Sequence, residues 1–600
     1  MRFFLIFLSL CFCGLSHAAD GDIMITPDSL PKEAVMRITP DSSLTDAVRK
    51  AREMRRLGQA DKVTIVMSRG MYQLYEPLVL RPEDSGLHFV GDDENVIISG
   101  GLPVTEWRQN GKLLEADIPD FNGRPMDFRQ VWVNGEKAVR ARDVTDFEQM
   151  HRIINVDKKK RVIWVPTQAV KNIVNAPYAE MVLHEMWCVA NLRIKSIDID
   201  GDSAAVSFHN PESKLQFEHP WPSPMYNSDH DSPFYLTNAM ELLDTPGEWY
   251  YDIRSRKLYY YPKDGQTPDN IEVFIPAIET LVEVEGTPEE RVCDVTFDNI
   301  AFAFTTWMRP SLYGHVPLQA GMYLTEAYKL RPQIDRPNNH KLDNQGWLGR
   351  ADAAVRINYG EGVSFHRCSF FAMGGSGVDY EEGCLGGKVS DCKFADIAMN
   401  GYVCGSFSPK GLETHKPYRP ADDRVVCSGQ EVTNTLFTNI GNEDWGCVAI
   451  AAGYVRNIDI NHNEICEVPY SGISLGWGWN RDSVCMRDNK ITANLIYHYA
   501  KHMYDCAGIY TLGNQPGTVI SRNVVRDIYS PSYVHDPNHW FYLYTDEGSS
   551  NITLRDNWTP SDKYLKNAVG PGNVWENNGP DVDKSIVNDA GRLVDDCGNP

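Results

Sequence analysis

The hydrophobic and polar positions of the chain follow a short repeat from about residue 292 to residue 560. Each repeat begins with a brief strand-like run of alternating polar and apolar residues, and a glycine followed by an apolar residue comes downstream. The interval between these two signals is nine residues in three repeats, which run from Cys368 to Gly377, from Cys392 to Gly401 and from Asn463 to Gly472. It grows to twelve residues between Asn434 and Gly446 and to nineteen between Asn489 and Gly508. A constant frame with variable length at one corner is typical of a solenoid, whose coils stack while loops project from one face.

The length of the repeat indicates the kind of solenoid. The units span about 24 to 34 residues, as from Cys368 to Cys392 and from Asn489 to Asn523. Leucine-rich repeats would show regular leucines and helical repeats a period of 3.6 residues, so we predict an all-β fold, a right-handed parallel β-helix. Asparagines that share one phase of the frame are predicted to stack at a coil corner and to bond turn backbone groups. They are Asn434, Asn463, Asn489, Asn523 and Asn557.

Two different patterns precede the repeat. Ser43 and Asp46 resemble a helix N-cap and its acidic partner, and apolar residues from Leu44 to Leu57 fall on one face of a helix. From about residue 104 to residue 270 the segments are longer, alternating and rich in aromatic residues. Here Trp249–Asp252 and Lys257–Tyr261 flank a polar turn and predict an antiparallel hairpin, so we infer an inserted antiparallel β-domain.

The beginning of the chain predicts export. Arg2 precedes an apolar run from Phe3 to Leu15, and Ser16-His17-Ala18 places small residues where a signal peptidase cuts. The run is shorter than the ~20 residues of a membrane span. We therefore expect a signal peptide cleaved near Ala18 and a periplasmic or extracellular protein without a membrane partner. The predicted organisation is a leader at 1–18, a capping helix with the first coils at 19–103, the inserted domain at 104–270, the catalytic β-helix at 271–563 and a capping tail at 564–600.

Composition narrows the class of protein and of partner. The 58 basic and 81 acidic residues give a formal net charge of −23, which argues against a nucleic-acid or anionic-membrane binder. Residues 430–550 hold 13 acids and 7 Lys and Arg, a net charge of −6 that is close to their share of the total, so the acidity is general. The cysteines form no CxxC clusters, which gives no support to a zinc ribbon or a disulfide scaffold.

Three acids stand where the repeat lengthens, at the corner whose loops build the walls of a groove. Asp444 lies in NEDWG, Asp505 in MYDCAG and Asp546 in LYTDEG. Asp505 and Asp546 belong to consecutive coils, which stack at about 4.8 Å. Their axial separation of about 5 Å, plus a lateral offset that the sequence leaves open, falls in the range of paired acids in glycoside hydrolysis. We predict Asp505 and Asp546 as the catalytic pair, with the stereochemical outcome open.

Aromatic and polar residues around these acids are candidates for binding a sugar, whose C–H faces stack on rings while its hydroxyl groups bond to polar neighbours. Trp477 and Trp479 have the i, i+2 spacing that places two indoles on one face of a strand. His498 with His502 and His535 with His539 have i, i+4 spacing, but no HExxH glutamate lies between them, so hydroxyl binding is favoured over a metal. The predicted substrate-binding residues are Asp444, Trp445, Trp477, Trp479, His502, Tyr504, His539, Trp540 and Glu547. No cofactor is predicted, and a structural calcium ion remains an alternative.

With these features the chain resembles glycoside hydrolase family 141. The resemblance covers nearly the whole mature chain and is carried by HFVGDDENVIISGG, DTPGEWYYDIRSRKLYYYP, SGISLGWGWN, YDCAGIYTLG and LYTDEGSS, of which the early segments also occur in other β-helix hydrolases. It implies an α-L-fucosidase acting on complex pectic side chains or a xylanase. The acid pair of the family corresponds to Asp505 and Asp546 of this chain.

The first hypothesis is therefore a secreted, monomeric, exo-acting α-L-fucosidase whose partner is an oligosaccharide or polysaccharide. An endo-xylanase on the same scaffold is the second. A pectate-type lyase would need a basic residue that removes a proton and commonly calcium, but the acid-rich coils show no dense Lys and Arg groove for a polyuronate. Polygalacturonase-type hydrolysis is less favoured because the RIK string at Arg193–Lys195 lies in the inserted domain. A glycan-binding β-helix without activity is the last alternative, since a fold does not determine a function.

Overall fold

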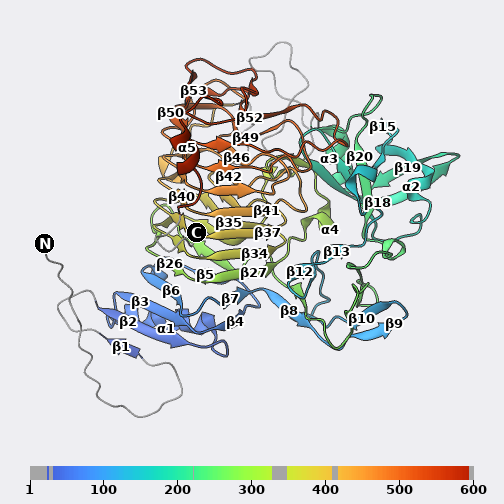
Figure 1. The fold of residues 1–600 in the computed structure, drawn as a ribbon. Coiled ribbons are helices and arrows are strands. Elements are labelled where there is room, and N and C mark those ends of the chain that lie inside the picture. Colours follow the sequence, from blue (N-terminus) through green and yellow to red (C-terminus); the bar gives the residue numbers. More distant parts are fainter. Residues whose placement is uncertain (1–22, 26–31, 220–221, 327–347, 408–415, 594–600) are drawn as a thin grey trace.

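The computed structural model describes residues 23–25, 32–219, 222–326, 348–407 and 416–593 (Figure 1). The leader predicted at 1–18 lies outside the described residues. Among the helices of these ranges, none has the length and apolar character needed to cross a membrane.

A right-handed parallel β-helix forms the body of the molecule, as predicted from the repeat (Figure 1). Three long sheets run along it, and nearly every strand pairs in parallel with the strands of the coils before and after it. The 13-stranded sheet contains β1 (Ile23–Ile25), β2 (Glu33–Ile38), β3 (Lys62–Met67), β6 (Leu87–Gly91), β26 (Thr296–Asp298), β33 (Ser364–His366), β36 (Lys388–Ser390), β40 (Glu431–Thr433), β44 (Asp459–Asn461), β47 (Lys490–Thr492), β50 (Asn514–Ser521), β53 (Ser550–Arg555) and β55 (Val574–Glu576). The 9-stranded sheet contains β4 (Gly70–Gln73), β7 (Val96–Ser99), β27 (Ala301–Thr305), β34 (Ser369–Met373), β37 (Lys393–Ile397), β41 (Leu436–Ile440), β45 (Glu464–Cys466), β48 (Leu495–Ile496) and β51 (Val524–Val525).

The third sheet of the β-helix has ten strands and carries the predicted acid pair. Its strands are β5 (Leu78–Leu80), β24 (Val282–Glu285), β31 (Ala353–Asn358), β35 (Ser376–Glu382), β38 (Tyr402–Cys404), β42 (Ile450–Ala452), β46 (Ile473–Leu475), β49 (Cys506–Thr511), β52 (Trp540–Thr545) and β54 (Tyr564–Lys566). Strands β54 and β55 continue two sheets past residue 563, where the sequence predicted the start of a capping tail.

Columns of identical side chains fill the interior of the coils. Phe302, Phe370, Phe394 and Phe437 are fully buried, and successive rings stack with centroids 4.5 to 4.9 Å apart. Stacked rings at the spacing of neighbouring strands fix the register between coils, because a slip of one residue would move each ring to the outer face. The described cysteines are free thiols, and all but Cys293 are buried.

A ladder of asparagines is present, but its members differ from those predicted. Asn463, Asn494, Asn523, Asn557 and Asn578 form it, and each of the first four donates a hydrogen bond of 2.8 to 2.9 Å from its side-chain amide to the next Oδ1. Asn489 lies outside this ladder because its Oδ1 accepts from the Ile458 N–H one corner earlier. Asn434 also lies outside it, and Thr435 donates its N–H to Asn463 instead. Both errors are errors of phase, since the sequence does not fix which of two nearby polar residues occupies the corner.

The inserted β-domain leaves the β-helix through β8 (Gly101–Val104) and returns through β23 (Val273–Pro276), which pair in antiparallel fashion. Strand β23 lies past residue 270, where the sequence placed the end of the insert. Two smaller sheets adjoin this neck, with β11 (Trp132–Val133) and β12 (Glu136–Lys137) in one and β9 (Arg108–Asn110), β10 (Leu113–Asp117), β13 (Val139–Arg140), β21 (Glu248–Asp252) and β22 (Lys257–Tyr260) in the other. The predicted hairpin is formed by β21 and β22.

The outer part of the insert is a seven-stranded sheet that lies beside the β-helix (Figure 1). It contains β14 (His151–Arg152), β15 (Asn155–Asp157), β16 (Val162–Pro166), β17 (Glu180–His184), β18 (Val189–Asp200), β19 (Ser203–Phe208) and β20 (Pro233–Thr237). A small sheet of β28 (Pro317–Gln319), β29 (Met322–Leu324) and β30 (Leu348–Gly349) adjoins it through a bridge between Asn191 and His315. The turn between β17 and β18 reaches the coil that holds Asp505, since the His184 imidazole at the end of β17 lies 2.9 Å from the His502 carbonyl oxygen.

The first helix, which the sequence predicted, is the longest helix in the described part of the chain, and the others are short. Helix α1 (Leu44–Arg56) begins at Ser43, whose side chain accepts a hydrogen bond from the Asp46 N–H as predicted. Its buried face ends at Met54, since Leu57 is exposed. The other helices are α2 (Thr167–Val170), α3 (Glu212–Glu218), α4 (Arg309–Tyr313), α5 (Lys584–Asp589), η1 (Pro82–Asp84), η2 (Phe147–Gln149), η3 (Met240–Leu242) and η4 (Asp423–Val425). Two further two-stranded sheets are formed by β25 (Val292–Cys293) and β32 (Gly360–Glu361), and by β39 (Cys427–Ser428) and β43 (Val455–Arg456).

Candidate active site

Asp505 and Asp546 stand on consecutive coils but at opposite ends of two paired strands. Asp505 directly precedes β49, and Asp546 directly follows β52. In the parallel register Cys506 pairs with Trp540 and Thr511 pairs with Thr545, so that Asp505 lies beside His539. The two acids are therefore not stacked one above the other at the coil spacing, and the offset that the sequence left open runs along the strands. Their side chains nevertheless line the same cavity.

Asp546 is 9% exposed, and each oxygen of its carboxyl group accepts a hydrogen bond. Tyr510 donates its hydroxyl to Oδ2 at 2.5 Å, and Asn567 donates its amide to Oδ1 at 2.7 Å. Burial raises the pKa of Asp546 to about 6, which these two hydrogen bonds only partly oppose, and the charge of Asp505 raises it further. A buried carboxyl that keeps its proton to about pH 6 has the character of a general acid.

The Asp505 carboxyl has a basic neighbour instead. The Nε2 atom of His539 lies 3.1 Å from Asp505 Oδ1, and this hydrogen bond raises the pKa of the His539 imidazole. The backbone also holds the residue in place, since Tyr470 donates its hydroxyl to the Asp505 carbonyl at 2.9 Å. Asp505 has a φ of 54°, a left-handed conformation that Asp tolerates better than most residues. The Asp505 carboxyl thus faces an imidazole, whereas the Asp546 carboxyl faces a phenol and an amide.

A cavity of about 420 Å³ contains both carboxyl groups. The β-helix contributes Tyr470, Tyr510 and Tyr544 to its wall, and burial followed by the charges of the two aspartates raises the pKa of the Tyr544 hydroxyl. The inserted domain contributes Met186, Trp187 and Ser223, and Gln319 from β28 completes this side. The insert thus closes the acid pair from the side of the β-helix that its turn contacts, which makes the site a pocket with mixed polar and aromatic walls.

Two of the predicted substrate-binding residues lie in this cavity. Trp479 and Glu547 both line it. Trp477 does not, and its indole is 1% exposed and packs against Phe407 and Trp479 at centroid distances of 5.0 and 5.1 Å. The expectation that both indoles share a strand face is wrong, because the run follows β46 and has glycines with φ near 90° at Gly476 and Gly478. Trp477 is therefore a core residue.

Asp444 also lies away from the acid pair. Its carboxylate is 4% exposed, with Oδ2 at 2.9 Å from Nε2 of His315 and Oδ1 accepting the Gly446 N–H at 3.0 Å. Because His315 precedes β28 next to the insert, the stretched corner at Asp444 serves to hold the two parts of the molecule together. The prediction of a substrate-binding role for Asp444 is not supported by this geometry.

Five further predicted residues lie around the cavity or beyond it. His539 contacts Asp505, and Trp540 starts β52 with the Lys563 ammonium 3.6 Å from its ring centre. Tyr504 is buried and its hydroxyl has no hydrogen-bond partner among the described residues. Trp445 and His502 stack on each other at 4.3 Å and line a separate cavity.

Sequence reasoning missed most of the wall of the site. Tyr510 and Tyr544 occupy paired positions of β49 and β52 in the motifs that hold the two acids, so their repetition was a usable signal. Asn567 directly follows β54 on the next coil, as Asp546 follows β52, so its position in the repeat could have identified it. Residues of the insert gave no local signal. Within the described ranges, no group of three or more His, Cys, Asp or Glu side chains is arranged to hold a metal ion.

Comparisons with known proteins identify two kinds of relative. Residues 111–263 match the family model described as the GH141 insertion domain. A solved structure described as a glycoside hydrolase is 56% identical to this chain and superposes with a TM-score of 0.91. The match covers 93% of this chain and 99% of the solved chain.

Other solved structures match far more weakly. An exopolygalacturonase from Thermotoga maritima is 10% identical with 94% of each chain covered and a TM-score of 0.32. The surface adhesin PfbA of Streptococcus pneumoniae is 11% identical, with 89% and 88% of the two chains covered and a TM-score of 0.32. Among curated protein sequences, none matches this chain.

Proposed function

Because this chain belongs to glycoside hydrolase family 141, we propose that it is an exported α-L-fucosidase that releases fucose from the ends of complex pectic glycans. The observation that carries the proposal is the placement of Asp505 and Asp546 in one cavity of about 420 Å³. A pocket that the inserted domain walls on one side suits a terminal sugar, whereas an enzyme that cuts inside a long chain needs a groove open at both ends. The wall contributed by Met186 and Trp187 of the insert favours the terminal mode.

The two carboxyl groups take different roles in the proposed reaction. Asp546, whose pKa of about 6 keeps it protonated in weakly acidic solution, donates its proton to the departing glycosidic oxygen. Asp505, which contacts the imidazole of His539, attacks the anomeric carbon or removes a proton from the attacking water. Tyr510 and Asn567 hold the Asp546 carboxyl in place and accommodate its charge after proton transfer. No step needs a group beyond the side chains of this chain and water.

The remaining walls are suited to holding the sugar. Trp479 and Trp187 present indoles to the cavity, and rings of this kind stack on the C–H face of a pyranose. Glu547 and Gln319 line the same space and supply acceptors and a donor for hydroxyl groups. Such a combination of aromatic faces and polar groups is typical of pockets that bind small polar ligands.

Product analysis tests this function. Purified protein is incubated with a fucosylated pectic oligosaccharide, and the products are separated by chromatography. We expect free fucose as the early product and no change in the length of the remaining chain. Shortened chains from xylan without fucose release would instead support the endo-xylanase, and unsaturated products that absorb in the ultraviolet and disappear with a chelator would support a lyase. Glycan binding without turnover would contradict a catalytic role.

Export is the second part of the proposal. The apolar run from Phe3 to Leu15 and the small residues before Ala19 support it. Expression of the full sequence in a bacterium should give a periplasmic or extracellular protein whose N-terminal residue, determined by mass spectrometry, is Ala19. An unprocessed N-terminus in the cytoplasmic fraction would contradict it.

A further inference from the structure

A second cavity, of about 280 Å³, lies between the inserted domain and the corners of the coils. It shares no lining residue with the cavity of the acid pair. Trp445 and His502, which the sequence singled out as sugar-binding residues, belong to its wall. The opposite wall comes from the insert and includes Arg142, Phe147 and Tyr235.

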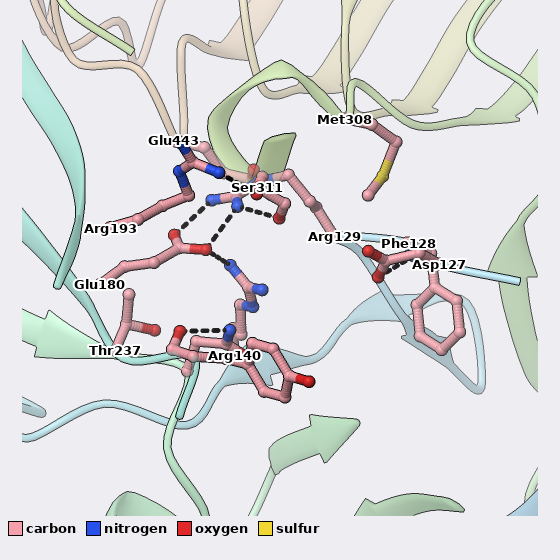
Figure 2. A network of polar contacts seen from close by, with 12 residues as sticks. Asp127, Phe128, Arg129, Arg140, Glu180, Arg193, Thr237, Met308, Ser311 and Glu443 are labelled. Atoms are coloured by element: carbon pink, nitrogen blue, oxygen red, sulfur yellow. Dashed lines mark hydrogen bonds and ion pairs between the residues drawn. The ribbon is translucent and has the colours of Figure 1, made fainter. Parts of the chain in front are cut away.

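Positive charge is concentrated in this second cavity although the protein as a whole is acidic. Five cationic side chains line it, namely Arg129, Lys137, Arg140, Arg142 and Lys501. Figure 2 shows Arg129 and Arg140 reaching the carboxylate of Glu180 from two sides, so these two cations share one anion. Lys137 pairs with Glu443 and Lys501 pairs with Glu467. The remaining acid of the wall, Asp396, accepts hydrogen bonds from Trp132 and Asn442.

Arg142 differs from the other four cations. Within the described part of the chain its guanidinium has no acidic partner and no hydrogen bond, and its buried Nε is unsatisfied. The group is held 4.7 Å from the ring centre of Phe147, which fixes its plane while leaving its N–H edge available. An unpaired, oriented guanidinium in a cavity is suited to binding a carboxylate through two parallel hydrogen bonds.

The other groups on the wall suit a sugar ring. Phe147, Tyr235 and Trp445 form an aromatic cluster with centroid distances of 4.7 to 5.9 Å. The Asn191 Oδ1 atom is buried without a hydrogen-bond partner among the described residues and can accept from a hydroxyl group. Burial lowers the pKa of the His502 imidazole to about 3 and raises that of the Tyr235 hydroxyl to about 12, so both are uncharged near neutral pH. The positive charge available to a ligand is therefore that of Arg142, since the other four cations have acidic partners.

We propose that this cavity binds a uronic acid, with its carboxylate on Arg142 and its ring against the aromatic cluster. The inference goes beyond the proposed hydrolysis, because it concerns a separate site and does not depend on which sugar Asp505 and Asp546 release. It assigns the insert a second role, the recognition of an acidic residue on the glycan. A single cavity of this size accommodates one acidic sugar and does not require a basic groove for a whole polyuronate.

Binding measured by calorimetry tests the inference without turnover. The probes are galacturonate, glucuronate, galactose and inorganic phosphate. We expect the wild-type protein to bind at least one uronate about tenfold or more tightly than galactose, since a charge-assisted bidentate contact is lost with the neutral sugar. Arg142→Gln should abolish this preference and Arg142→Lys should retain part of it. Arg254→Gln is the matched control, because Arg254 also stacks on a ring of the insert, Tyr178, but lines neither cavity.

Each alternative outcome has a defined meaning. Equal affinity for galactose and both uronates overturns the proposal, and so does a preference that survives in Arg142→Gln. Displacement of uronate by inorganic phosphate at equal concentration also overturns it, by showing a general anion site. The selectivity of the wild-type protein needs no substitution and remains decisive if Arg142→Gln does not fold. A crystal soaked with the bound uronate should show its carboxylate on Arg142, and density only at Asp505 and Asp546 would contradict the proposal.

Discussion

The hydroxyl of Tyr510 donates a 2.5 Å hydrogen bond to Oδ2 of Asp546. The donor and the acceptor lie on consecutive strands of one sheet, Tyr510 within β49 and Asp546 after β52. The bond stabilises the ionised carboxylate, while burial favours the protonated form, and burial has the larger effect. The pKa of Asp546, about 6, is thus the result of two opposed interactions that substitution can separate.

Replacement of Tyr510 by Phe should move the pH dependence of activity. In the proposed reaction Asp546 acts in its protonated form, so kcat/KM of the wild-type protein should fall as the pH rises through about 6. Tyr510→Phe removes a hydrogen bond that lowers the pKa of Asp546, so the pKa rises and the alkaline limb should shift to higher pH by about one unit. The measurement is kcat/KM for fucose release between pH 4 and pH 9.

Tyr542→Phe is a suitable control for this shift. Tyr542 lies in β52 two residues before Tyr544, and it does not line the cavity of the acid pair. Its substitution should leave the alkaline limb in place. A shift of the acidic limb to higher pH in Tyr510→Phe, with the alkaline limb in place, would mean that Asp546 acts in its ionised form, and the assigned roles of the two aspartates would be reversed.

Activated substrates should separate the acid from its partner. Asp546→Asn is expected to lower kcat on a natural glycan by about 10²- to 10⁴-fold, because the leaving group is no longer protonated. On a dinitrophenyl α-L-fucoside the loss should be much smaller, since that leaving group departs without a proton. Asp505→Asn should lose activity on both substrates, because the attack itself fails in either case.

Asp488→Asn is the control for the two aspartate variants. Asp488 is an exposed acid at a turn of the same repeat, and its φ of 57° is accessible to Asn. Its substitution should leave both activities unchanged. Full activity of Asp505→Asn or Asp546→Asn on the natural glycan would remove the pair from the mechanism.

The fold could be predicted from the sequence because the signals that define it are local. Each coil repeats a short strand and a glycine at a fixed interval, and the register of the strands follows from that frame. The local sequence does not determine the phase within a corner, as Asn489 and Asn494 show. Both lie in the segment DNKITAN, and only the pairing of Asp459 with Lys490 reveals that Asn494 continues the column of Asn463.

The site could be predicted only in part, because half of its wall is not encoded near the acids. Asp505 and Asp546 were predicted from their places in consecutive coils, and both line one cavity. Trp187 comes from a turn of the insert far away in the sequence, and nothing local marks its contact with the cavity. The same docking accounts for the lengthened corner at Asp444, whose carboxylate contacts His315.

The two tryptophans of the GWGW run should respond differently to truncation. Trp479→Ala removes a ring from the wall of the cavity, so we expect KM for an oligosaccharide to rise about tenfold, with a small change in the unfolding midpoint. Trp477→Ala leaves a void in the core and should lower the free energy of unfolding by about 3 to 5 kcal/mol. Steady-state kinetics and thermal unfolding of both variants provide the comparison. A destabilised Trp479→Ala with unchanged KM would place that ring in the core as well.

The asparagine ladder should contribute stability that can be measured at a single position. Asn494 is fully buried, and its Oδ1 accepts hydrogen bonds from both the backbone N–H and the side-chain amide of Asn463. In Asn494→Ala these two donors remain buried without an acceptor, at a cost of about 1 to 3 kcal/mol for each orphaned group. Denaturant unfolding should therefore show a loss of several kcal/mol. The exposed Asn538 is the control, and Asn538→Ala should change the free energy of unfolding by about 0.5 kcal/mol or less. Equal stability of the two variants would mean that the coils are held by their apolar columns alone, with the amide ladder contributing nothing.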